Sequence, residues 1–349
     1  MPTPPATFAP DWRAALDAVR GCPRHAPTPL RRVRIDGAEL SLKDEGARFG
    51  LGSFKALGGA WAVIEAVRAR RAAADGERPA LETLFEPDAR AGNADASFVC
   101  ASAGNHGIAV AAGAALLGAR ARVHLSAEVP EDFAARLRGH GAEVVRSGET
   151  YAESLDAALA DAETGGAELI ADTAWEGYVE VPTRIMAGYT VVGEELRETF
   201  EASGDWPTDL YLQAGVGGLA GAMTWIVRER WAVQPRIVIV EPEAAPCLAR
   251  SAETGEVATV EGPVSSMGRL DCKSASPLAV DALAGAGVEY LAISDPEAEE
   301  AVRALAEAGV GSTPSGAAGV AAWRIERQRG VCAGARPLAI VSEGALGDA

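Results

Sequence analysis

Lysine is unusually scarce in this chain. Of its 32 basic residues only three are lysines, Lys43, Lys55 and Lys273, and the others are arginines. An arginine keeps its charge in a protein, whereas a lysine can lose its proton and act as an amine nucleophile. Lys55 lies in a glycine-rich segment, residues 49–59, that leads into a helical pattern. This setting suits a lysine that forms a Schiff base, although a compositional drift toward arginine would give the same count.

A second glycine-rich motif covers residues 215–221, after a predicted strand and before a predicted helix. Backbone N–H groups in such a turn, with the helix dipole behind them, bind phosphate. The Gly-Lys-Ser/Thr ending of a P-loop is absent, and the glycine spacing only approximates the dinucleotide fingerprint. Glu241 alone stands near the position where that fingerprint expects an acidic residue. A phosphate site and a tight packing turn are therefore both open at this stage.

A third motif, residues 102–107, lies at a predicted strand-to-helix junction. Free N–H groups at such a junction bind carboxylate or phosphate, and the Asn105 amide can donate to a phenolate oxygen. Alternatively, Ser102 or Asn105 simply caps the helix, and His106 is a structural histidine. Taken alone, four further polar segments are ordinary caps or turns: residues 172–178, 182–189, 313–316 and 342–344.

Short apolar runs alternate with alanine-rich stretches along most of the chain. We expect buried strands at residues 97–101, 121–125, 143–146, 210–214, 236–241 and 338–342, with helices between them. Such alternation indicates parallel sheets covered by helices, and so predicts an α/β fold with two doubly wound domains. We expect residues 85–194 to form a smaller domain inserted into a larger one made of residues 1–84 and 195–349.

Length, composition and charge argue against several classes of protein. A length of 349 residues suggests about two domains. There is no apolar run long enough for a membrane span and no signal-peptide pattern. The five scattered cysteines indicate a reducing, cytoplasmic setting without a disulfide framework or metal site. The net charge of −17 argues against nucleic acid as a partner.

The order of the motifs is more specific than any one of them. Ser-Phe-Lys55, Ser-Ala-Gly-Asn105-His, Gly-Val-Gly-Gly218, Thr-Pro-Ser-Gly316 and Ser342-Glu-Gly follow one another along the chain. In this order, across about residues 28–346, the chain resembles the fold type II pyridoxal-phosphate enzymes, the group of tryptophan synthase β and threonine dehydratase. Within that group it is most similar to the diaminopropionate ammonia-lyases, because longer strings also match: Lys43-Asp-Glu45, residues 172–178 and 182–189, and the segment 240–251.

The resemblance implies a cofactor, pyridoxal 5′-phosphate, in the cleft between the two domains. Lys55 would form the Schiff base, and its freed amine would later move the substrate's α-proton. Phe54 would pack near the cofactor ring, Asn105 would bond its phenolic oxygen, and Ser342 would meet its pyridine nitrogen. The phosphate would be held by backbone N–H groups of five residues: Gly215, Val216, Gly217, Gly218 and Leu219.

The resemblance also implies a substrate site, in which this chain departs from the ammonia-lyases. Ser102 and the N–H groups of Ala103, Gly104 and residues 105 and 106 would hold the substrate carboxylate, with His106 beside them. Asp172 matches an acidic site residue of the lyases, but Ala103 replaces their aspartate. Two further cations, Arg269 and Lys273, stand where the lyases have small neutral residues. They would favour an anionic or hydroxylated substrate, unless they pair with acids at the rim of the pocket.

The implied reaction is α,β-elimination from a small β-substituted amino acid. The leading substrate is 2,3-diaminopropionate, giving pyruvate and ammonia, with dehydration of serine, threonine or 3-hydroxyaspartate as the alternative. An NAD-dependent oxidoreductase using residues 215–221 is a remote alternative, because it explains neither Lys55 nor Asn105. Relatives of this kind are commonly homodimers, which by analogy is the expected assembly.

Overall fold

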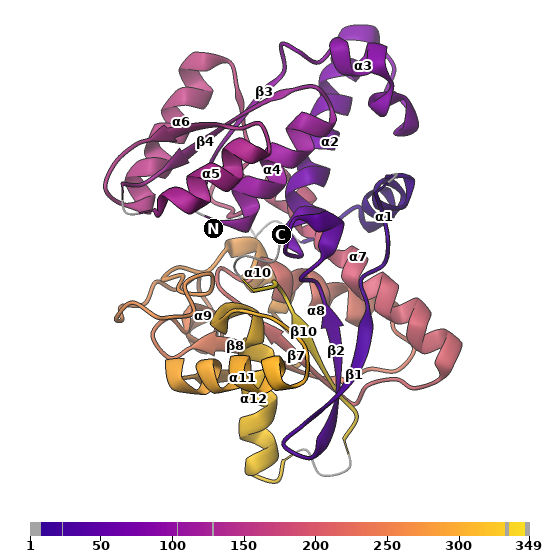
Figure 1. Cartoon of the computed structure of the whole chain (residues 1–349), viewed down its shortest axis with the longest axis vertical. Helices are drawn as coiled ribbons and strands as arrows, with labels where there is room; N and C mark the ends of the chain where they lie inside the picture. Colours follow the sequence, from indigo (N-terminus) through magenta and orange to yellow (C-terminus); the bar gives the residue numbers. More distant parts are fainter. Residues whose placement is uncertain (1–7, 23, 103, 128, 332–334, 346–349) are drawn as a thin grey trace.

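The structure is a computed structural model that describes residues 8–22, 24–102, 104–127, 129–331 and 335–345. Two β-sheets lie in two lobes, one above the other in Figure 1. The lower sheet has the strand order β1 (Leu30–Ile35), β2 (Ala38–Asp44), β10 (Pro337–Val341), β7 (Asp209–Gln213), β8 (Arg236–Pro242) and β9 (Val288–Ile293). The upper sheet has the order β5 (Glu143–Arg146), β4 (Arg120–Leu125), β3 (Ser97–Ala101) and β6 (Glu168–Leu169).

All strand pairs in both sheets are parallel except one, which confirms the predicted fold class with an addition. The exception is the β1–β2 hairpin, which places an antiparallel strand at the edge of the lower sheet. Its turn is Asp36-Gly37, and both residues have positive φ, as the favoured two-residue hairpin turns require. Every residue of β7 and β10 is buried, because helices cover both faces of the sheet.

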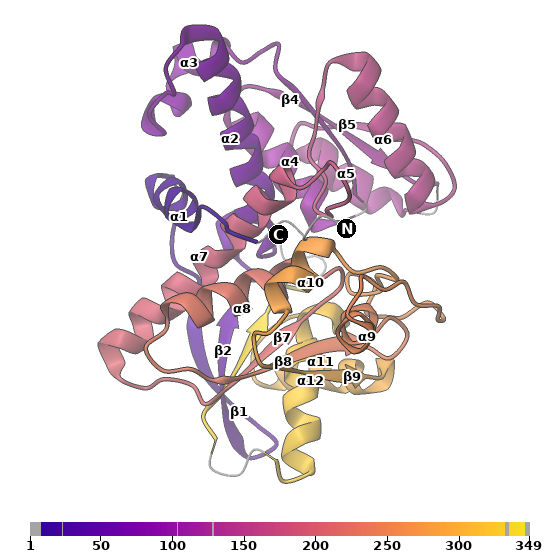
Figure 2. The same ribbon diagram turned by 180° about the vertical axis from the view of Figure 1, so that it is seen from behind.

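Helices cover the sheets and join the lobes. The helices around the upper sheet are α2 (Lys55–Asp75), α3 (Pro87–Ala91), α4 (Asn105–Leu116), α5 (Glu131–Gly139) and α6 (Tyr151–Gly165). Short 3-10 turns lie at Arg48–Gly50, between β2 and α2, and at Glu82–Phe85, between α2 and α3. The remaining helices are α1 (Trp12–Gly21), α7 (Glu180–Ser203), α8 (Gly218–Arg230), α9 (Cys247–Thr254), α10 (Pro277–Leu283), α11 (Asp295–Glu307) and α12 (Pro314–Gln328). In Figure 2, α7 runs from the upper lobe along the lower one.

The domain boundaries given above remain a prediction. They assign α2 to the larger domain, whereas α2 packs against α4 and lies with the upper lobe in both views (Figures 1 and 2). One buried apolar cluster runs from α2 and α4 through α7 to α8, so the lobes share a core at this point. Within the described ranges, no helix is both long enough and apolar enough to cross a lipid bilayer.

Candidate active site

The predicted site residues meet where parallel strands of both sheets end. Asn105 follows β3 and Asp172 follows β6 in the upper sheet, whereas residues 215–219 follow β7 and Ser342 follows β10 in the lower sheet. Lys55 is the first residue of α2. Ligands of α/β proteins bind outside the carboxyl ends of the strands. The fold therefore brings together residues that are up to about 290 positions apart in the chain.

Lys55 and Asp172 form an ion pair at this meeting point. Lys55 Nζ donates to Asp172 Oδ2 at 2.6 Å, and the two side chains are 24% and 19% exposed. Burial alone would lower the pKa of Lys55, but the Asp172 carboxylate outweighs burial and raises it. Burial likewise opposes ionisation of Asp172, but Lys55 holds the pKa of Asp172 well below its usual range. In this state the lysine is an ammonium held by a carboxylate, within reach of solvent.

Tyr189 of α7 links Lys55 to the glycine turn. Lys55 Nζ lies 5.6 Å from the centre of the Tyr189 ring, and Phe54 packs edge-on against that ring with centroids 4.8 Å apart. The Cε2 edge of the ring faces Gly218, since a Cβ built on that glycine would be 3.5 Å from Tyr189 Cε2. Burial raises the pKa of Tyr189 to about 12, so its phenol stays neutral. The lysine and the glycine turn therefore both lie against Tyr189.

The glycine turn has the features of a phosphate site. Gly217, the N-cap of α8, has φ of 100°, and a Cβ there would lie 2.6 Å from Ala279 Cβ, so only glycine fits. No side chain caps α8, so the first N–H groups of the helix have no side-chain partner at its N-cap. Gly215, Val216 and Gly218 are partly exposed. Open N–H groups at a helix N-terminus suit a phosphate bearing negative charge.

Glu343, an acid to which the sequence assigned no role in the site, connects Asn105 to the strand end that carries Ser342. Asn105 Nδ2 donates to Glu343 Oε2, and Thr313 Oγ1 donates to Glu343 Oε1. Phe54 N–H donates to the Ser342 carbonyl at 3.1 Å. In the sequence, Glu343 follows a strand and reads as an ordinary cap, because its partners are 30 and 238 residues away.

Of the substrate candidates in the upper lobe, Ser102 contacts its own segment, whereas His106 contacts the segment after β6. Ser102 Oγ accepts N–H bonds from Gly104 and Gly107 at 3.2 and 3.0 Å, although the N-cap residue of α4 is Gly104 and the helix begins at Asn105. His106 Nε2 lies 2.7 Å from the Ile170 carbonyl oxygen, and its Nδ1 lies 4.0 Å from Asp172 Oδ2. Ala103 lies outside the described residues. The proposed contacts of these residues with substrate remain predictions.

The two extra cations have different surroundings. Lys273 Nζ donates to the carbonyls of Ala244 and Pro263 at 2.9 and 2.8 Å, and to Asp271 Oδ1 at 2.5 Å, so its three donors are already used. Arg269 instead lies beside the start of α4, where a Cβ built on Gly104 would be 3.2 Å from its Nε. The structure therefore favours Arg269 over Lys273 as a residue that contacts substrate.

Arg269 is only partly paired. Its Nε lies 3.7 Å from Glu343 Oε2, and its guanidinium carbon lies 5.0 Å from the centre of the Phe133 ring. That Nε is buried and has no hydrogen-bond partner within the described part of the chain. A buried guanidinium donor without an acceptor is costly unless a ligand supplies one. Arg269 thus has a donor free for an anionic group at the α4 N-terminus.

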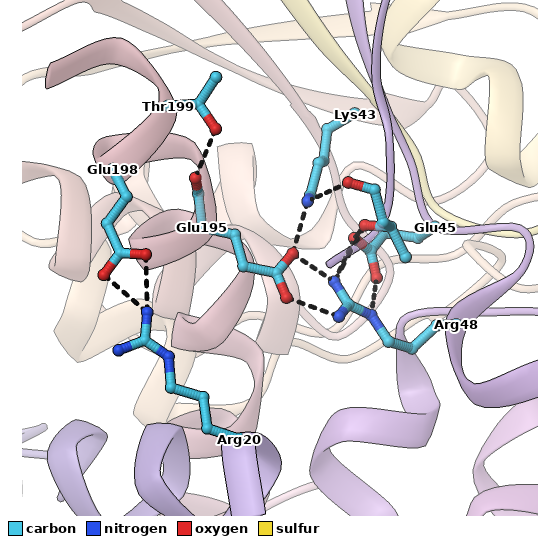
Figure 3. Close-up of polar contacts among 8 residues, drawn as sticks. Arg20, Lys43, Glu45, Arg48, Glu195, Glu198 and Thr199 are labelled. Carbon is cyan, nitrogen blue, oxygen red and sulfur yellow. Dashed lines mark hydrogen bonds and ion pairs between the residues drawn. The ribbon is translucent and has the colours of Figure 1, made fainter. Parts of the chain in front are cut away.

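A buried ionic cluster fixes the strand end that leads to Lys55 (Figure 3). Lys43 Nζ donates to Glu195 Oε2 at 2.5 Å, and Arg48 donates to Glu195 and Glu45 at 2.7 to 2.8 Å. All four side chains are at most 5% exposed. Burial opposes the charge of Arg48, but Glu45 and Glu195 outweigh it and raise the pKa of Arg48. Two cations and two anions balance, which makes the buried cluster tolerable.

Glu241, the acid that a dinucleotide site would use for a ribose, is used inside the protein. Its carboxylate accepts the N–H groups of Leu248 and Ala249, both at 2.8 Å, at the N-terminus of α9. Burial raises the pKa of Glu241 to about 7, although the two N–H groups act to lower it. This side chain is 1% exposed and caps a helix, so the oxidoreductase alternative loses its ribose ligand.

The raised pKa of Glu241 predicts a pH dependence of stability. The folded protein binds this proton more tightly than the unfolded chain, whose ordinary value is 4.5, so the contribution of Glu241 is lost as pH rises through 7. Relative to Glu241→Gln, we expect the wild-type free energy of unfolding to fall by about 2–3 kcal/mol between pH 4.5 and 8. Urea unfolding of both proteins across this range measures the difference. A difference that is constant, or that moves in favour of the wild type as pH rises, would contradict the assignment.

Comparison with known proteins agrees with the geometry. The family model for pyridoxal-phosphate dependent enzymes matches residues 22–343. The chain belongs to this family. It is 32% identical to diaminopropionate ammonia-lyase of Escherichia coli K12 over 289 residues, which cover 80% of this chain and 71% of the relative. It is 37% identical to the Salmonella typhimurium LT2 enzyme of the same name over 254 residues, 68% of this chain and 63% of the relative.

The fold of this chain is also similar to that of solved structures. The crystal structure of the E. coli diaminopropionate ammonia-lyase in complex with an aminoacrylate–PLP azomethine reaction intermediate has a TM-score of 0.82 to this chain, with 27% identity. The superposition covers 97% of this chain and 91% of the other. The predicted family, the fold type II class and the cofactor, pyridoxal phosphate, are thus confirmed. The glycine turn, the reachable Lys55 amine and the neutral Tyr189 phenol fit a cofactor of this shape and charge.

Proposed function

We propose that this chain eliminates the β-substituent of 2,3-diaminopropionate, giving pyruvate and ammonia. Its reaction class is pyridoxal-phosphate-dependent elimination on small amino acids. The observation that carries the proposal is the Lys55–Asp172 pair, 2.6 Å apart and next to the open glycine turn. A diamino acid brings a leaving amine that must be protonated, and a proton shared by an amine and a carboxylate at this point can serve that need.

In the proposed elimination, each part of the site has a separate role. When bound, pyridoxal phosphate supplies an electron sink for the charge left by loss of the α-proton. The N–H groups of residues 215–219 would hold its phosphate. The Lys55 amine would take the α-proton, and Asp172 would hold Lys55 in place and stabilise its charged form. The start of α4 would hold the substrate carboxylate, since N–H groups and the helix dipole favour an anion there.

A second candidate substrate is favoured by one observation. The unpartnered Nε of Arg269 at the α4 N-terminus suits a further anionic group, as in 3-hydroxyaspartate. In that case water would leave in place of ammonia, through the same Lys55 chemistry. The alternative keeps the same Lys55 chemistry and differs from the main proposal in the side chain that the pocket accepts and in the group that leaves.

A substrate panel tests the choice. We expect the purified holoenzyme to release ammonia and a 2-oxo acid from 2,3-diaminopropionate with a kcat/KM at least about tenfold above those for serine, threonine and 3-hydroxyaspartate. Each compound is assayed as separate D and L isomers. Preference for 3-hydroxyaspartate that disappears in Arg269→Gln would replace the main proposal by the alternative. Absence of 2-oxo acid from every compound would reject both.

A further inference from the structure

The hydroxyl group of Tyr189 has no role in the site described above. The Tyr189 side chain is 1% exposed, and its Oη is buried without a hydrogen-bond partner among the described residues. Buried polar groups in proteins are nearly always hydrogen-bonded, and a buried donor without an acceptor costs free energy. Such a donor either receives its acceptor from a ligand or is tolerated by the fold. The surroundings of Tyr189 distinguish these two cases.

The Tyr189 ring lies between the first turns of two other helices. A Cβ built on Gly58 of α2 would overlap Tyr189 Cε1, and one built on Gly218 of α8 would lie 3.5 Å from Cε2. Phe54 packs edge-on against the ring, with centroids 4.8 Å apart. Because the hydroxyl is bonded to the carbon between Cε1 and Cε2, it points between the starts of α2 and α8. Close packing on both edges fixes this direction.

The start of α8 offers a reason for a donor at this place. This helix begins at Gly218 with N–H groups that no side chain caps, the part of the site suited to a phosphate. Burial raises the pKa of Tyr189 to about 12, so its hydroxyl keeps its proton and can donate it in a hydrogen bond. Phosphate oxygens are acceptors, and a hydrogen bond to a charged acceptor is stronger than one between neutral groups.

The Lys55 amine is the other candidate partner of this hydroxyl. Lys55 Nζ lies 5.6 Å from the centre of the Tyr189 ring and acts to lower the pKa of Tyr189, so the two groups are close. However, Lys55 is an ammonium that donates to Asp172 at 2.6 Å, and Tyr189 Oη makes no hydrogen bond with it in the described structure. An ammonium has no acceptor to offer to a phenol proton. A phosphate does offer one.

We propose that the Tyr189 hydroxyl donates a hydrogen bond to the phosphate of the cofactor. The glycine turn binds the phosphate through backbone N–H groups, and Tyr189 adds a side-chain donor from α7. The hydroxyl is buried while Lys55 lies against the ring, so Lys55 turns away from Tyr189 when it joins the cofactor. The proposal rests on the cofactor and is independent of the amino acid that the enzyme uses.

Two ligands isolate the phosphate contact. Pyridoxal 5′-phosphate and pyridoxal both carry the aldehyde that reacts with a lysine, but pyridoxal lacks the phosphate. Each is titrated into the full chain freed of cofactor, and the absorbance of the bound ligand gives its Kd. We expect Tyr189→Phe to weaken binding of pyridoxal 5′-phosphate about 10- to 100-fold and to change binding of pyridoxal by less than about twofold.

Two results of this titration would overturn the proposal. An equal loss of affinity for both ligands would mean that the hydroxyl acts on Lys55 or on the fold. Unchanged affinity for both ligands would mean that the hydroxyl contacts neither. Since no substrate is present, the outcome does not depend on whether 2,3-diaminopropionate is the substrate.

Thermal stability gives a second readout. Tyr189→Phe removes a buried donor that has no acceptor until the cofactor binds, so the cofactor-free variant should melt at the wild-type temperature or above it. At equal concentration, pyridoxal 5′-phosphate should then raise the melting temperature of the variant less than that of the wild type. A cofactor-free variant that melts below the wild type would show that the hydroxyl stabilises the fold, against the proposal.

Thr224→Val is the matched control. Thr224 Oγ1 is also buried and without a partner within the described ranges, but Thr224 lies more than one turn along α8 from Gly218. Removal of this hydroxyl should leave the affinity for both ligands unchanged. If Thr224→Val lost as much affinity for pyridoxal 5′-phosphate as Tyr189→Phe, the loss would not report a phosphate contact, and the proposal would be wrong.

Discussion

Replacing Lys55 with alanine is expected to lower the turnover of the proposed elimination by at least about 10³-fold, because it removes the proposed base and nucleophile in one step. The cofactor should still bind, through the glycine turn, without a covalent link to the chain. Ammonia and 2-oxo acid release measure the turnover. Mass spectrometry after borohydride treatment measures the link, which should add the cofactor to wild type at Lys55 and not to the variant.

Lys55→Arg distinguishes the proton-accepting amine of Lys55 from its positive charge. An arginine can keep the ion pair with Asp172, but it does not lose its proton and cannot act as the base. We therefore expect Lys55→Arg to match the wild type in thermal stability and Lys55→Ala in turnover. Turnover within tenfold of the wild type in either variant would mean that another group moves the α-proton.

The largest effect on stability is expected from Glu195→Ala. This change leaves Lys43 and Arg48 buried with only the Glu45 carboxylate between them. Breaking a buried ionic group by removing one partner typically costs about 3–5 kcal/mol. Urea unfolding of the variant should show a loss of this size. Because Arg48 immediately precedes the segment that carries Lys55, the variant should also hold its cofactor less tightly.

Glu198→Ala is the matched control for this effect. Glu198 lies on the same helix as Glu195 and also pairs with an arginine, Arg20, at 2.6 Å (Figure 3). The side chains of that pair are 45% and 44% exposed, and exposed pairs contribute roughly 0–1 kcal/mol. Equal losses in the two variants would show that burial of the cluster around Glu195 does not decide its contribution.

Much of the fold could be predicted because its central strands are buried on both faces. Residues 210–212 and 237–240 therefore read as unbroken apolar runs, and the observed strands begin or end within about one residue of the prediction. The β1–β2 hairpin was missed because β1 is an edge strand with exposed Arg31, Arg32 and Arg34, which mask its alternation. The Asp36-Gly37 turn was the signal that could have revealed it.

The residues of the site could be predicted from the sequence, but the contacts among them could not. A glycine turn between a strand and a helix is specified by residues next to one another in the sequence. The turn at residues 215–218 could therefore be recognised from their spacing alone. The partners of Glu343 come from two other segments, and nothing in the local sequence of Glu343 specifies them. Likewise, the sequence places Lys273 near the site, but only the fold shows that its ammonium holds a loop together. The catalytic and binding roles themselves remain predictions.

The segment just before Lys55 is tied to the lower lobe, whereas the helix that begins at Lys55 belongs to the upper one. Ser53 bridges to Glu343, Gly344 N–H donates to the Gly52 carbonyl, and Phe54 N–H donates to Ser342. A rotation that opened or closed the two lobes would therefore pivot at the base of the lysine side chain. The amine would stay in register with Ser342, while the parts of the upper lobe farthest from the pivot, such as α3 and α6, travelled most (Figure 1). Such a hinge lets the enzyme admit substrate without moving its reactive amine.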